Sequence, residues 1–339
     1  MKKLLAILLS CIMVASLAAC GGSSNPTSTG TGEAAPADTV YEISISHIVN
    51  EDNTWHKASV YFKEYLEEKS GGRVKVTIYP NSQLGPEIDA INSIMSDGGV
   101  DITFTGESLQ SVVPEMGILG VPYLMRTSEQ LQAVANGPVG DQLKQLMYEQ
   151  ANMVVLGYFE RGPRNVTANK EIRTPDDMSG LIIRVPASPI TVAAMEALGA
   201  KPTPMALAEV FTSLQQNTID AQENPLAMIA TSNFYEVQKY LCRTEHLLSY
   251  VYIAMSKTKF ESMPEDLQQL VLEAGAAMQK YEHELFLQGE DELEAFLKEK
   301  GMTFIEDVDK EAFAAKATEG IEKVLPDALK PLYDEIKAM

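Results

Sequence analysis

The 339-residue sequence contains few cysteines and few histidines, and these shortages exclude several classes of protein. Cysteine occurs only at positions 11, 20 and 242, and the four histidines are scattered along the chain. No zinc motif or Cys/His cluster can be assembled from them, so we expect no metal site. The chain also lacks a Gly-x-Ser-x-Gly elbow and a phosphate-binding loop. We therefore expect no cofactor, and no motif indicates an enzyme.

Basic residues are also scarce. The chain has 27 Lys and Arg against 47 Asp and Glu, which gives a formal net charge of −20. Such a surface does not favour nucleic acid or anionic lipid, so we expect no nucleic-acid partner. It would also repel an anionic solute at long range. An anion-binding site in this chain must therefore rely on a local cationic pocket.

The N-terminus lacks an apolar run long enough to cross a membrane. Lys2 and Lys3 precede the apolar stretch 4–17, which is shorter than the roughly 20 residues of a spanning helix. This layout predicts a signal peptide over residues 1–19. The following Cys20 stands in a sequence similar to a bacterial lipobox, which predicts a lipid anchor on its thiol. The alternative is an ordinary secretory signal.

Residues 20–37 are rich in Gly, Ser, Thr and Pro and cannot bury apolar area. We interpret them as a flexible linker that spans roughly 25 Å on average. Once Cys11 is cleaved off and Cys20 is acylated, Cys242 has no partner for an intrachain disulfide. It is interpreted as a small buried hydrophobe.

The rest of the chain alternates strand and helix patterns. Strands are predicted over 41–48, 74–79 and 100–104, with helices between them, which indicates βαβ units and a largely parallel sheet. Further strands are predicted over 152–158 and 249–256. A helical pattern begins after Pro264 and runs nearly to Gly301, although Gly275 and Gly289 within it could interrupt the helix.

One charged residue stands inside a short apolar run. Arg184 lies in the stretch 181–185, which Pro186 ends, and Ser188-Pro189 is typical of a helix start. A charge at the carboxyl end of a buried strand lies where open α/β sheets bind ligands. The guanidinium is a planar fork that matches a carboxylate. The alternative is a structural ion pair with Asp177 or Glu196.

A longer block of residues resembles a known family. Its segments are Arg184-Val185-Pro186, Gly199-Ala200-Lys201-Pro202-Thr203-Pro204-Met205, Glu209-Val210-Phe211 and Asp220-Ala221-Gln222-Glu223-Asn224-Pro225. They follow the order seen in the DctP-type substrate-binding proteins of TRAP transporters. Ala221 and Phe211 replace the usual Gly and Tyr. A weaker resemblance extends over roughly residues 40–335.

The resemblance implies a two-lobed α/β fold, like that of periplasmic binding proteins, with a ligand cleft and a long helix spanning both lobes. Lobe I would comprise residues 38–160 and 249–288, and lobe II residues 161–248 and 289–339. The protein would be extracytoplasmic and would deliver its ligand to the small and large TRAP membrane subunits.

The resemblance also implies site residues. Arg184 would clamp a ligand carboxylate, while Arg164, Asn224 and Glu107 would contact the rest of the ligand. Leu207, His47 and Asn53 complete the expected set. Several alternatives stay open. Glu107 could stabilise a helix start, and Asn224 could stabilise a turn. Leu207 could belong to the apolar stripe of a helix that faces the core. Asn53 or Thr54 could cap a helix. Arg161 and Arg173 are interpreted as solvated loop residues.

The expected ligand is a small organic acid. An ionised Glu107 would repel the second carboxylate of a C4-dicarboxylate but would accept hydrogen bonds from hydroxyls. The pattern therefore favours a sugar acid, such as a uronate. Two other functions are considered: a ligand-sensing lipoprotein of the same fold, and a secreted hydrolase that uses Glu107 and Glu223 as paired carboxylates.

Overall fold

A computed structural model describes residues 39–339, which belong to one compact unit. The predicted signal peptide, Cys20 and the linker lie outside the described residues. The described part contains one nine-stranded sheet. Its strands are β1 (Tyr41–Ser46), β2 (Val74–Tyr79), β3 (Ile102–Thr105), β4 (Met153–Ala168), β5 (Ile182–Val185), β6 (Lys201–Pro204), β7 (Ala221–Asn224), β8 (Tyr240–Ser256) and β9 (Thr303–Ile305).

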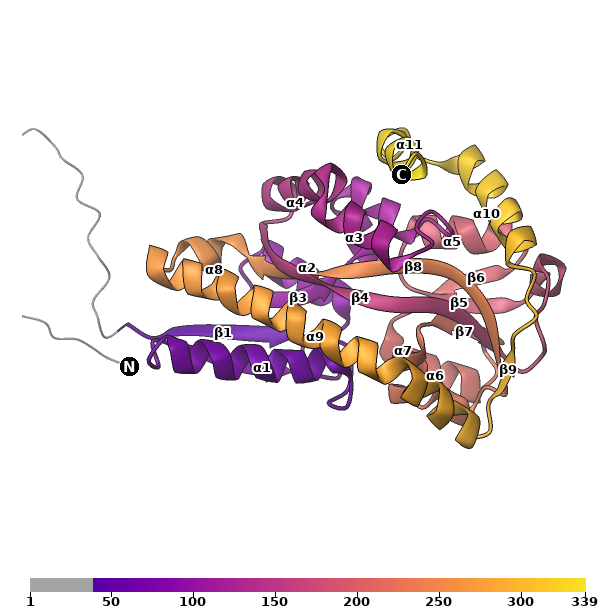
Figure 1. The fold of residues 1–339 in the computed structure, drawn as a ribbon, viewed down its shortest axis with the longest axis horizontal. Coiled ribbons are helices and arrows are strands. Elements are labelled where there is room, and N and C mark those ends of the chain that lie inside the picture. Colours follow the sequence, from indigo (N-terminus) through magenta and orange to yellow (C-terminus); the bar gives the residue numbers. More distant parts are fainter. Residues whose placement is uncertain (1–38) are drawn as a thin grey trace, which may run out of the picture. The chain divides into compact units, whose positions relative to one another are not determined.

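The strand order is β2-β1-β3-β8-β4-β7-β5-β6, with β9 on β8. Towards its two ends the sheet is parallel, where β1 pairs with β2 and β3, and β5 pairs with β6 and β7; the short β9 also pairs in parallel with β8. Its centre, β3-β8-β4-β7, is antiparallel. The prediction of a largely parallel sheet is therefore wrong for the centre, because two long strands join the parallel halves (Figure 1).

The two long strands extend well beyond the predicted strands 152–158 and 249–256. β4 continues to Ala168 although it contains Pro163, which cannot donate a backbone hydrogen bond. The β4–β8 register shifts on both sides of Arg164, so the ladder is interrupted next to the proline. Residues 161–168 are therefore strand, and the interpretation of Arg161 as a solvated loop residue is wrong.

Eleven α-helices and four short 3₁₀ helices cover the sheet in the described part of the chain. The α-helices are α1 (Thr54–Lys69), α2 (Glu87–Met95), α3 (Ser128–Asn136), α4 (Pro138–Gln150), α5 (Pro189–Ala197), α6 (Leu207–Gln215), α7 (Leu226–Thr231), α8 (Lys257–Glu261), α9 (Glu265–Glu299), α10 (Lys310–Val324) and α11 (Lys330–Lys337). The 3₁₀ helices are η1 (Glu107–Ser111), η2 (Pro114–Gly120), η3 (Pro175–Met178) and η4 (Phe234–Glu236). No helix among residues 39–339 combines the length and apolarity needed to cross a membrane.

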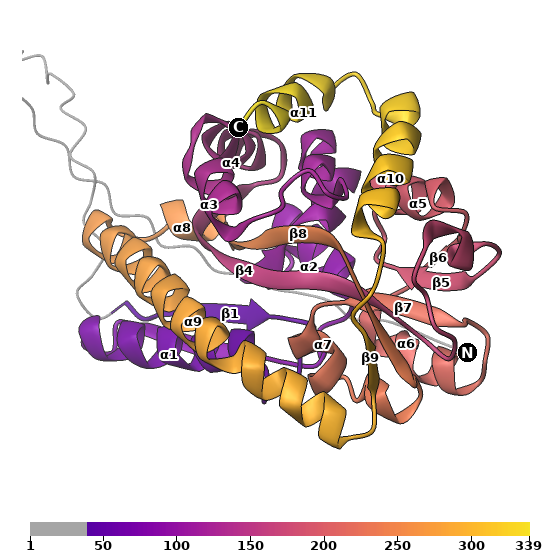
Figure 2. The same cartoon turned by 45° about the vertical axis from the view of Figure 1, so that its right-hand side comes forward.

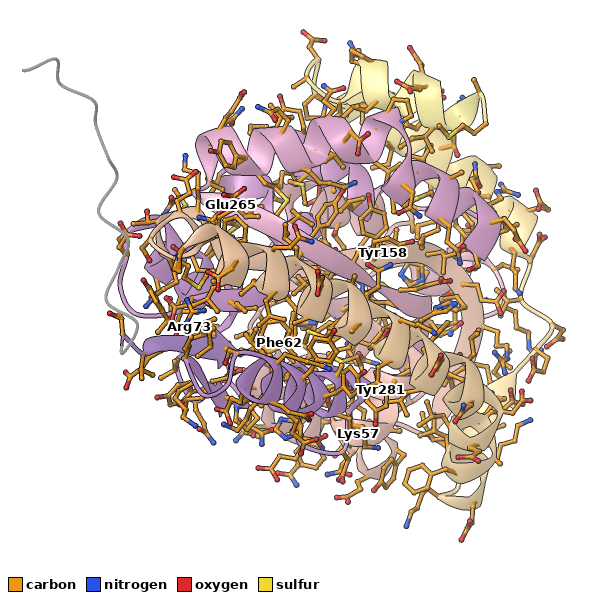
Figure 3. All side chains as sticks on the ribbon, turned by 60° about the vertical axis from the view of Figure 1, so that its left-hand side comes forward. Lys57, Phe62, Arg73, Tyr158, Glu265 and Tyr281 are labelled. Atoms are coloured by element: carbon orange, nitrogen blue, oxygen red, sulfur yellow. The ribbon has the colours of Figure 1, made fainter. Side chains whose placement is uncertain are left out.

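Helix α9 is an unbroken helix of 35 residues, which confirms the predicted long helix. It crosses β4 and β8 from the α1 side of the sheet towards α6 and β9 (Figures 1 and 2). Its buried residues include Val271, Ala274 and Met278, which belong to the same apolar cluster as Phe62 of α1. Figure 3 shows α9 beside α1, and the ring of Tyr281 stacks on that of Tyr61 at 4.6 Å.

Helix α9 also carries a buried acid, Glu282, whose side chain is 1% exposed. The Thr54 hydroxyl donates a hydrogen bond of 2.8 Å to its Oε1 atom, whereas Oε2 has no hydrogen-bond partner among the described residues. Burial raises the pKa of Glu282 to about 8. The carboxyl is therefore largely protonated at neutral pH, because the apolar surroundings disfavour its charged form.

The predicted role of Cys242 is confirmed. Its side chain is buried in an apolar cluster with Val166 and Ile183, and it forms no disulfide in the described part of the chain. Burial raises the pKa of its thiol to about 11, so the thiolate is scarce at neutral pH.

Candidate ligand-binding site

A cavity of about 40 Å³ lies where β3, β4, β5 and β7 meet. A second cavity of about 120 Å³ adjoins it and shares Glu87, Ser108 and Arg184 with it. The walls of the first cavity are Ile48, Trp55, Glu87, Phe104, Glu107, Ser108, Arg161, Arg164, Arg184, Pro186, Leu207, Asn224, Met228 and Val251. Of the residues predicted to contact ligand, Arg184, Arg164, Asn224, Glu107 and Leu207 line this cavity.

Arg184 is the third residue of β5, and only 5% of it is exposed. Its Nε and Nη2 atoms donate hydrogen bonds to the Met205 carbonyl at 2.9 and 2.6 Å. It forms no ion pair with any carboxylate among residues 39–339, so the alternative pairing with Asp177 or Glu196 is absent. Burial lowers the pKa of Arg184 to about 10, and the guanidinium stays charged at neutral pH.

Arg164 forms an ion pair with a carboxylate of the protein itself. Its Nη2 atom donates to the Glu223 side chain at 2.7 Å and to the Glu223 carbonyl at 2.6 Å, and Nε also contacts that carboxylate. His246 Nε2 lies 3.1 Å from Glu223 Oε2. Burial alone would raise the pKa of Glu223, but the charge and hydrogen bonds of Arg164 outweigh it and lower this pKa to about 2.

Arg161 and Glu107 form a second buried pair. Arg161 Nη2 lies 2.6 Å from Glu107 Oε2, and Nη1 lies 3.2 Å from Oε1. Arg161 also donates to the hydroxyl of Ser249. Burial disfavours the charged form of Glu107, but the charge of Arg161 prevails and lowers the pKa of the carboxyl. Glu107 is thus ionised and held by Arg161.

Glu87 is a site residue that the sequence reasoning missed. It is the first residue of α2, and it accepts hydrogen bonds from the hydroxyls of Thr105 (2.8 Å) and Ser108 (3.1 Å). It forms no ion pair in the described part of the chain. Burial and the neighbouring charge of Glu107 raise the pKa of Glu87. An acidic residue in a first helical turn is too common to signal a site by itself.

The cavity walls therefore carry three arginines and two glutamates. Arg161 pairs with Glu107, and Arg164 pairs with Glu223 behind the wall, so Arg184 and Glu87 are the wall residues without an ion-pair partner among residues 39–339. Asn224 ends β7 and donates its amide to the Gln222 side chain. Trp55, Phe104, Met228 and Val251 add apolar surface.

His47 and Asn53 do not line the cavity. His47 is buried against Phe104, with ring centroids 5.8 Å apart, and its Nε2 lies 3.2 Å from His56 Nδ1. Burial, followed by the neighbouring His56, lowers the pKa of His47 to about 4. Asn53 caps α1 by accepting a hydrogen bond from the Trp55 backbone at 3.0 Å. Both residues support the cavity wall from behind.

The cavity thus combines one buried cation without a carboxylate partner, Arg184, with two closed ion pairs and the unpaired Glu87. Both carboxylates of the hydrolase alternative, Glu107 and Glu223, are held by arginines. No group of three or more His, Cys, Asp or Glu side chains within residues 39–339 could hold a metal ion.

The sequence matches the bacterial extracellular solute-binding proteins of family 7 (DctP) over residues 45–326, and the chain belongs to this family. These are two-lobed, extracytoplasmic solute-binding proteins that work with the membrane subunits of TRAP transporters. They are not enzymes, and the hydrolase alternative is therefore wrong.

Named relatives bind sugar acids. Solute-binding protein RD1_1052 of Roseobacter denitrificans is 43% identical over 294 residues, which cover 87% of this chain and 90% of that protein. A crystal structure of that protein with bound L-galactonate has a TM-score of 0.85 at 42% identity, covering 88% of this chain and 99% of that one. The 2,3-diketo-L-gulonate-binding periplasmic protein YiaO of Escherichia coli is 34% identical, over 78% of this chain and 81% of that protein.

Proposed function

We propose that this protein captures a sugar acid in the cavity around Arg184 and delivers it to the small and large membrane subunits of a TRAP transporter. The observation that carries the proposal is the guanidinium of Arg184, which is buried and charged but has no counter-ion among residues 39–339. The Met205 carbonyl engages two of its five N–H groups. The remaining donors are free for the carboxylate of a ligand.

The other charges of the cavity favour a monocarboxylate that carries hydroxyls. Arg161 and Arg164 are already neutralised, so a second ligand carboxylate would find no free cation and would meet Glu87 and Glu107. Ligand hydroxyls can instead donate to Glu87 and accept from the Asn224 amide. The ligands of the relatives, L-galactonate and 2,3-diketo-L-gulonate, are acids of this type. A sugar acid is therefore favoured over a C4-dicarboxylate.

The proposed lobes keep the boundaries predicted from the sequence. Lobe I is residues 38–160 and 249–288, and lobe II is residues 161–248 and 289–339. With these boundaries Glu87 and Glu107 belong to lobe I, whereas Arg161 and Arg184 belong to lobe II. A ligand that contacts residues of both lobes would stabilise the closed arrangement.

Calorimetry tests the proposed function. We expect L-galactonate or D-galacturonate to bind the wild-type protein, and succinate to bind at least tenfold more weakly. Arg184→Ala should lose binding of both sugar acids while melting near the wild-type temperature. Tight binding of succinate, or unchanged affinity in the Ala variant, would contradict the proposal. Uptake of the ligand in cells that carry or lack the gene distinguishes transport from sensing.

Membrane attachment is proposed to depend on a lipid at Cys20. We expect Cys20→Ser to leave folding intact and to release the protein into the soluble fraction, because one or more acyl chains would provide the anchor. Cell fractionation with an antibody against the folded protein measures this. A Ser variant that stays wholly in the membrane fraction would disprove the lipid anchor.

A further inference from the structure

A larger cavity of about 470 Å³ lies elsewhere in the molecule and shares no wall residue with the site around Arg184. Its walls are Tyr123, Met125, Arg126, Thr127, Ser128, Glu160, Pro163, Glu245, Leu248, Phe286, Leu287, Glu290, Lys310 and Glu311. Glu160 and Arg161 are neighbours in β4, and both also line a small cavity of about 20 Å³. Glu160 reaches this cavity, whereas Arg161 reaches the site around Arg184.

One side of this cavity is apolar. Its apolar wall residues are Tyr123, Met125, Leu248, Phe286 and Leu287. Leu287 is 65% exposed. The volume lies within the range of roughly 300–1,000 Å³ that small-molecule sites occupy. A ligand with an apolar body of several carbon atoms would cover this surface.

The other side carries an excess of negative charge. Four glutamates and two basic residues line the cavity, and both basic residues are already paired, Arg126 with Glu311 at 3.2 Å and Lys310 with Glu245. Glu160 and Glu290 therefore keep no Lys or Arg partner among residues 39–339. Glu160 is 5% exposed and accepts a hydrogen bond of 2.8 Å from Ser128, and His283 Nδ1 lies 4.0 Å away.

The nearest additional cation, Arg243, does not remove this excess, because Glu245, Glu294 and Glu306 share its guanidinium. Burial raises the pKa of Glu290 to about 7, although the charge of Arg243 acts to lower it. A cation in the cavity would stabilise the ionised form of Glu290.

The wall opposite α9 is held in place by specific backbone contacts. Tyr123 has a left-handed conformation (φ 55°), which a bulky residue rarely adopts. Its backbone N–H donates to the His246 carbonyl at 2.9 Å, and its hydroxyl donates to the Thr244 carbonyl at 2.8 Å. These two bonds tie Tyr123, on one wall of the cavity, to β8.

We propose that this cavity is a second binding site, for a small organic cation with an apolar body. An ammonium group would lie between Glu160 and Glu290, and an aromatic or aliphatic body would pack on Phe286, Leu287 and Leu248. Glu160 and Glu290 would repel an anion, and a neutral ligand would gain no charge–charge interaction with them. The site shares no wall residue with the proposed sugar-acid site, although a small cavity lined by Glu160, Arg161 and Glu290 lies between them.

Three ligands of one shape test the proposal: benzylamine, benzyl alcohol and benzoate. Calorimetry or ligand-observed NMR should show saturable binding of benzylamine, with at least tenfold weaker binding of the alcohol and the acid. Glu290→Gln and Glu160→Gln should each weaken benzylamine binding at least tenfold. Glu311→Gln is the matched control, because that glutamate is already paired with Arg126, and it should change affinity less than threefold.

A further variant distinguishes the two sites. Arg184→Ala should leave benzylamine binding unchanged, because Arg184 does not line this cavity. Leu287→Ala should weaken binding without altering the charge, which keeps the test valid if a Glu variant unfolds. Absence of benzylamine binding, equal binding of benzyl alcohol, or loss of binding in Arg184→Ala would overturn the proposal.

Discussion

At the residue scale, the orientation of the Arg184 guanidinium determines how the proposed site would bind a carboxylate. Arg184 lies against the Met205 carbonyl, which fixes the plane of its fork at the cavity wall. A lysine at this position would keep the charge but present a single point donor on a flexible stem. Charge and geometry therefore make different predictions for the same position.

The first prediction compares Arg184→Lys with Arg184→Ala. We expect the Lys variant to bind L-galactonate at least about tenfold more weakly than the wild type, which corresponds to about 1.4 kcal/mol. The loss should depend little on salt, because the site is buried. Calorimetry at low and high salt measures this after the melting temperatures have been compared. Near-wild-type affinity in the Lys variant would show that charge alone suffices.

The second prediction concerns Glu282, whose pKa is about 8 in the folded protein against an ordinary value of 4.5. Between these pH values the folded protein holds a proton that the unfolded chain releases, so stability falls as pH rises through this window. Glu282→Gln mimics the protonated carboxyl and keeps the acceptor for Thr54. The variant should gain stability relative to the wild type as pH rises from 5 to 8, by more than about 1 kcal/mol.

Urea unfolding at pH 5, 6.5 and 8 measures the free energy of unfolding of both proteins. A difference that stays constant across this range would mean that Glu282 does not titrate within it. The outcome bears on the contact between α9 and the start of α1, because Thr54 is the first residue of α1.

At the scale of the elements, α9 is shaped by how closely it approaches β4. A Cβ atom added at Gly275 would lie 2.6 Å from the Leu156 Cβ and 2.7 Å from the Leu156 carbonyl oxygen. The glycine therefore lets the helix pack directly on the strand. Gly289, in the same helix, has no atom within 4 Å of the equivalent point.

The third prediction uses these two glycines as a matched pair. Alanine favours a helix interior over glycine by about 1 kcal/mol, so Gly289→Ala should stabilise the protein by up to that amount. Gly275→Ala gains the same propensity but must push α9 away from β4, and we expect a net loss of about 1–3 kcal/mol. Denaturant unfolding of both variants gives the comparison. Stabilisation by both substitutions would mean that the helix can shift freely.

The elements also show what a local pattern can predict. Three features follow from residues close together in the chain, and all three were predicted: a helix between β1 and β2, the length of α9, and the position of Arg184 at the end of β5. The partners of Arg161 and Arg164 could not be predicted, because Glu107 and Glu223 lie 54 and 59 residues away in the chain. The strand containing Pro163 was missed because proline normally argues against a central strand.

At the scale of the whole molecule, the proposed lobes are joined by β4, β8 and α9. Only these crossing elements would have to bend when the cleft closes, in the hinge manner of periplasmic binders. The Arg161–Glu107 pair would bridge the lobes beside the ligand. Ligand contacts from both sides would then favour the closed arrangement.

The fourth prediction is that L-galactonate contracts the protein. Small-angle scattering should give a smaller radius of gyration at saturation than without ligand, and Arg184→Ala should show no change at the same concentration. An unchanged radius for the wild type, with binding verified by calorimetry on the same sample, would exclude closure of the cleft.

The place of β8 in the sheet also sets the order in which the chain can fold. β8 lies between β3 and β4, although it follows both of them in the chain. Until residues 240–256 have been synthesised, the central strands lack the neighbour that joins them, and a native sheet cannot close. Such pairing of distant segments is slow. We therefore expect this topology to delay the formation of a stable core until most of the polypeptide has been made, which would suit passage of an unfolded chain across a membrane.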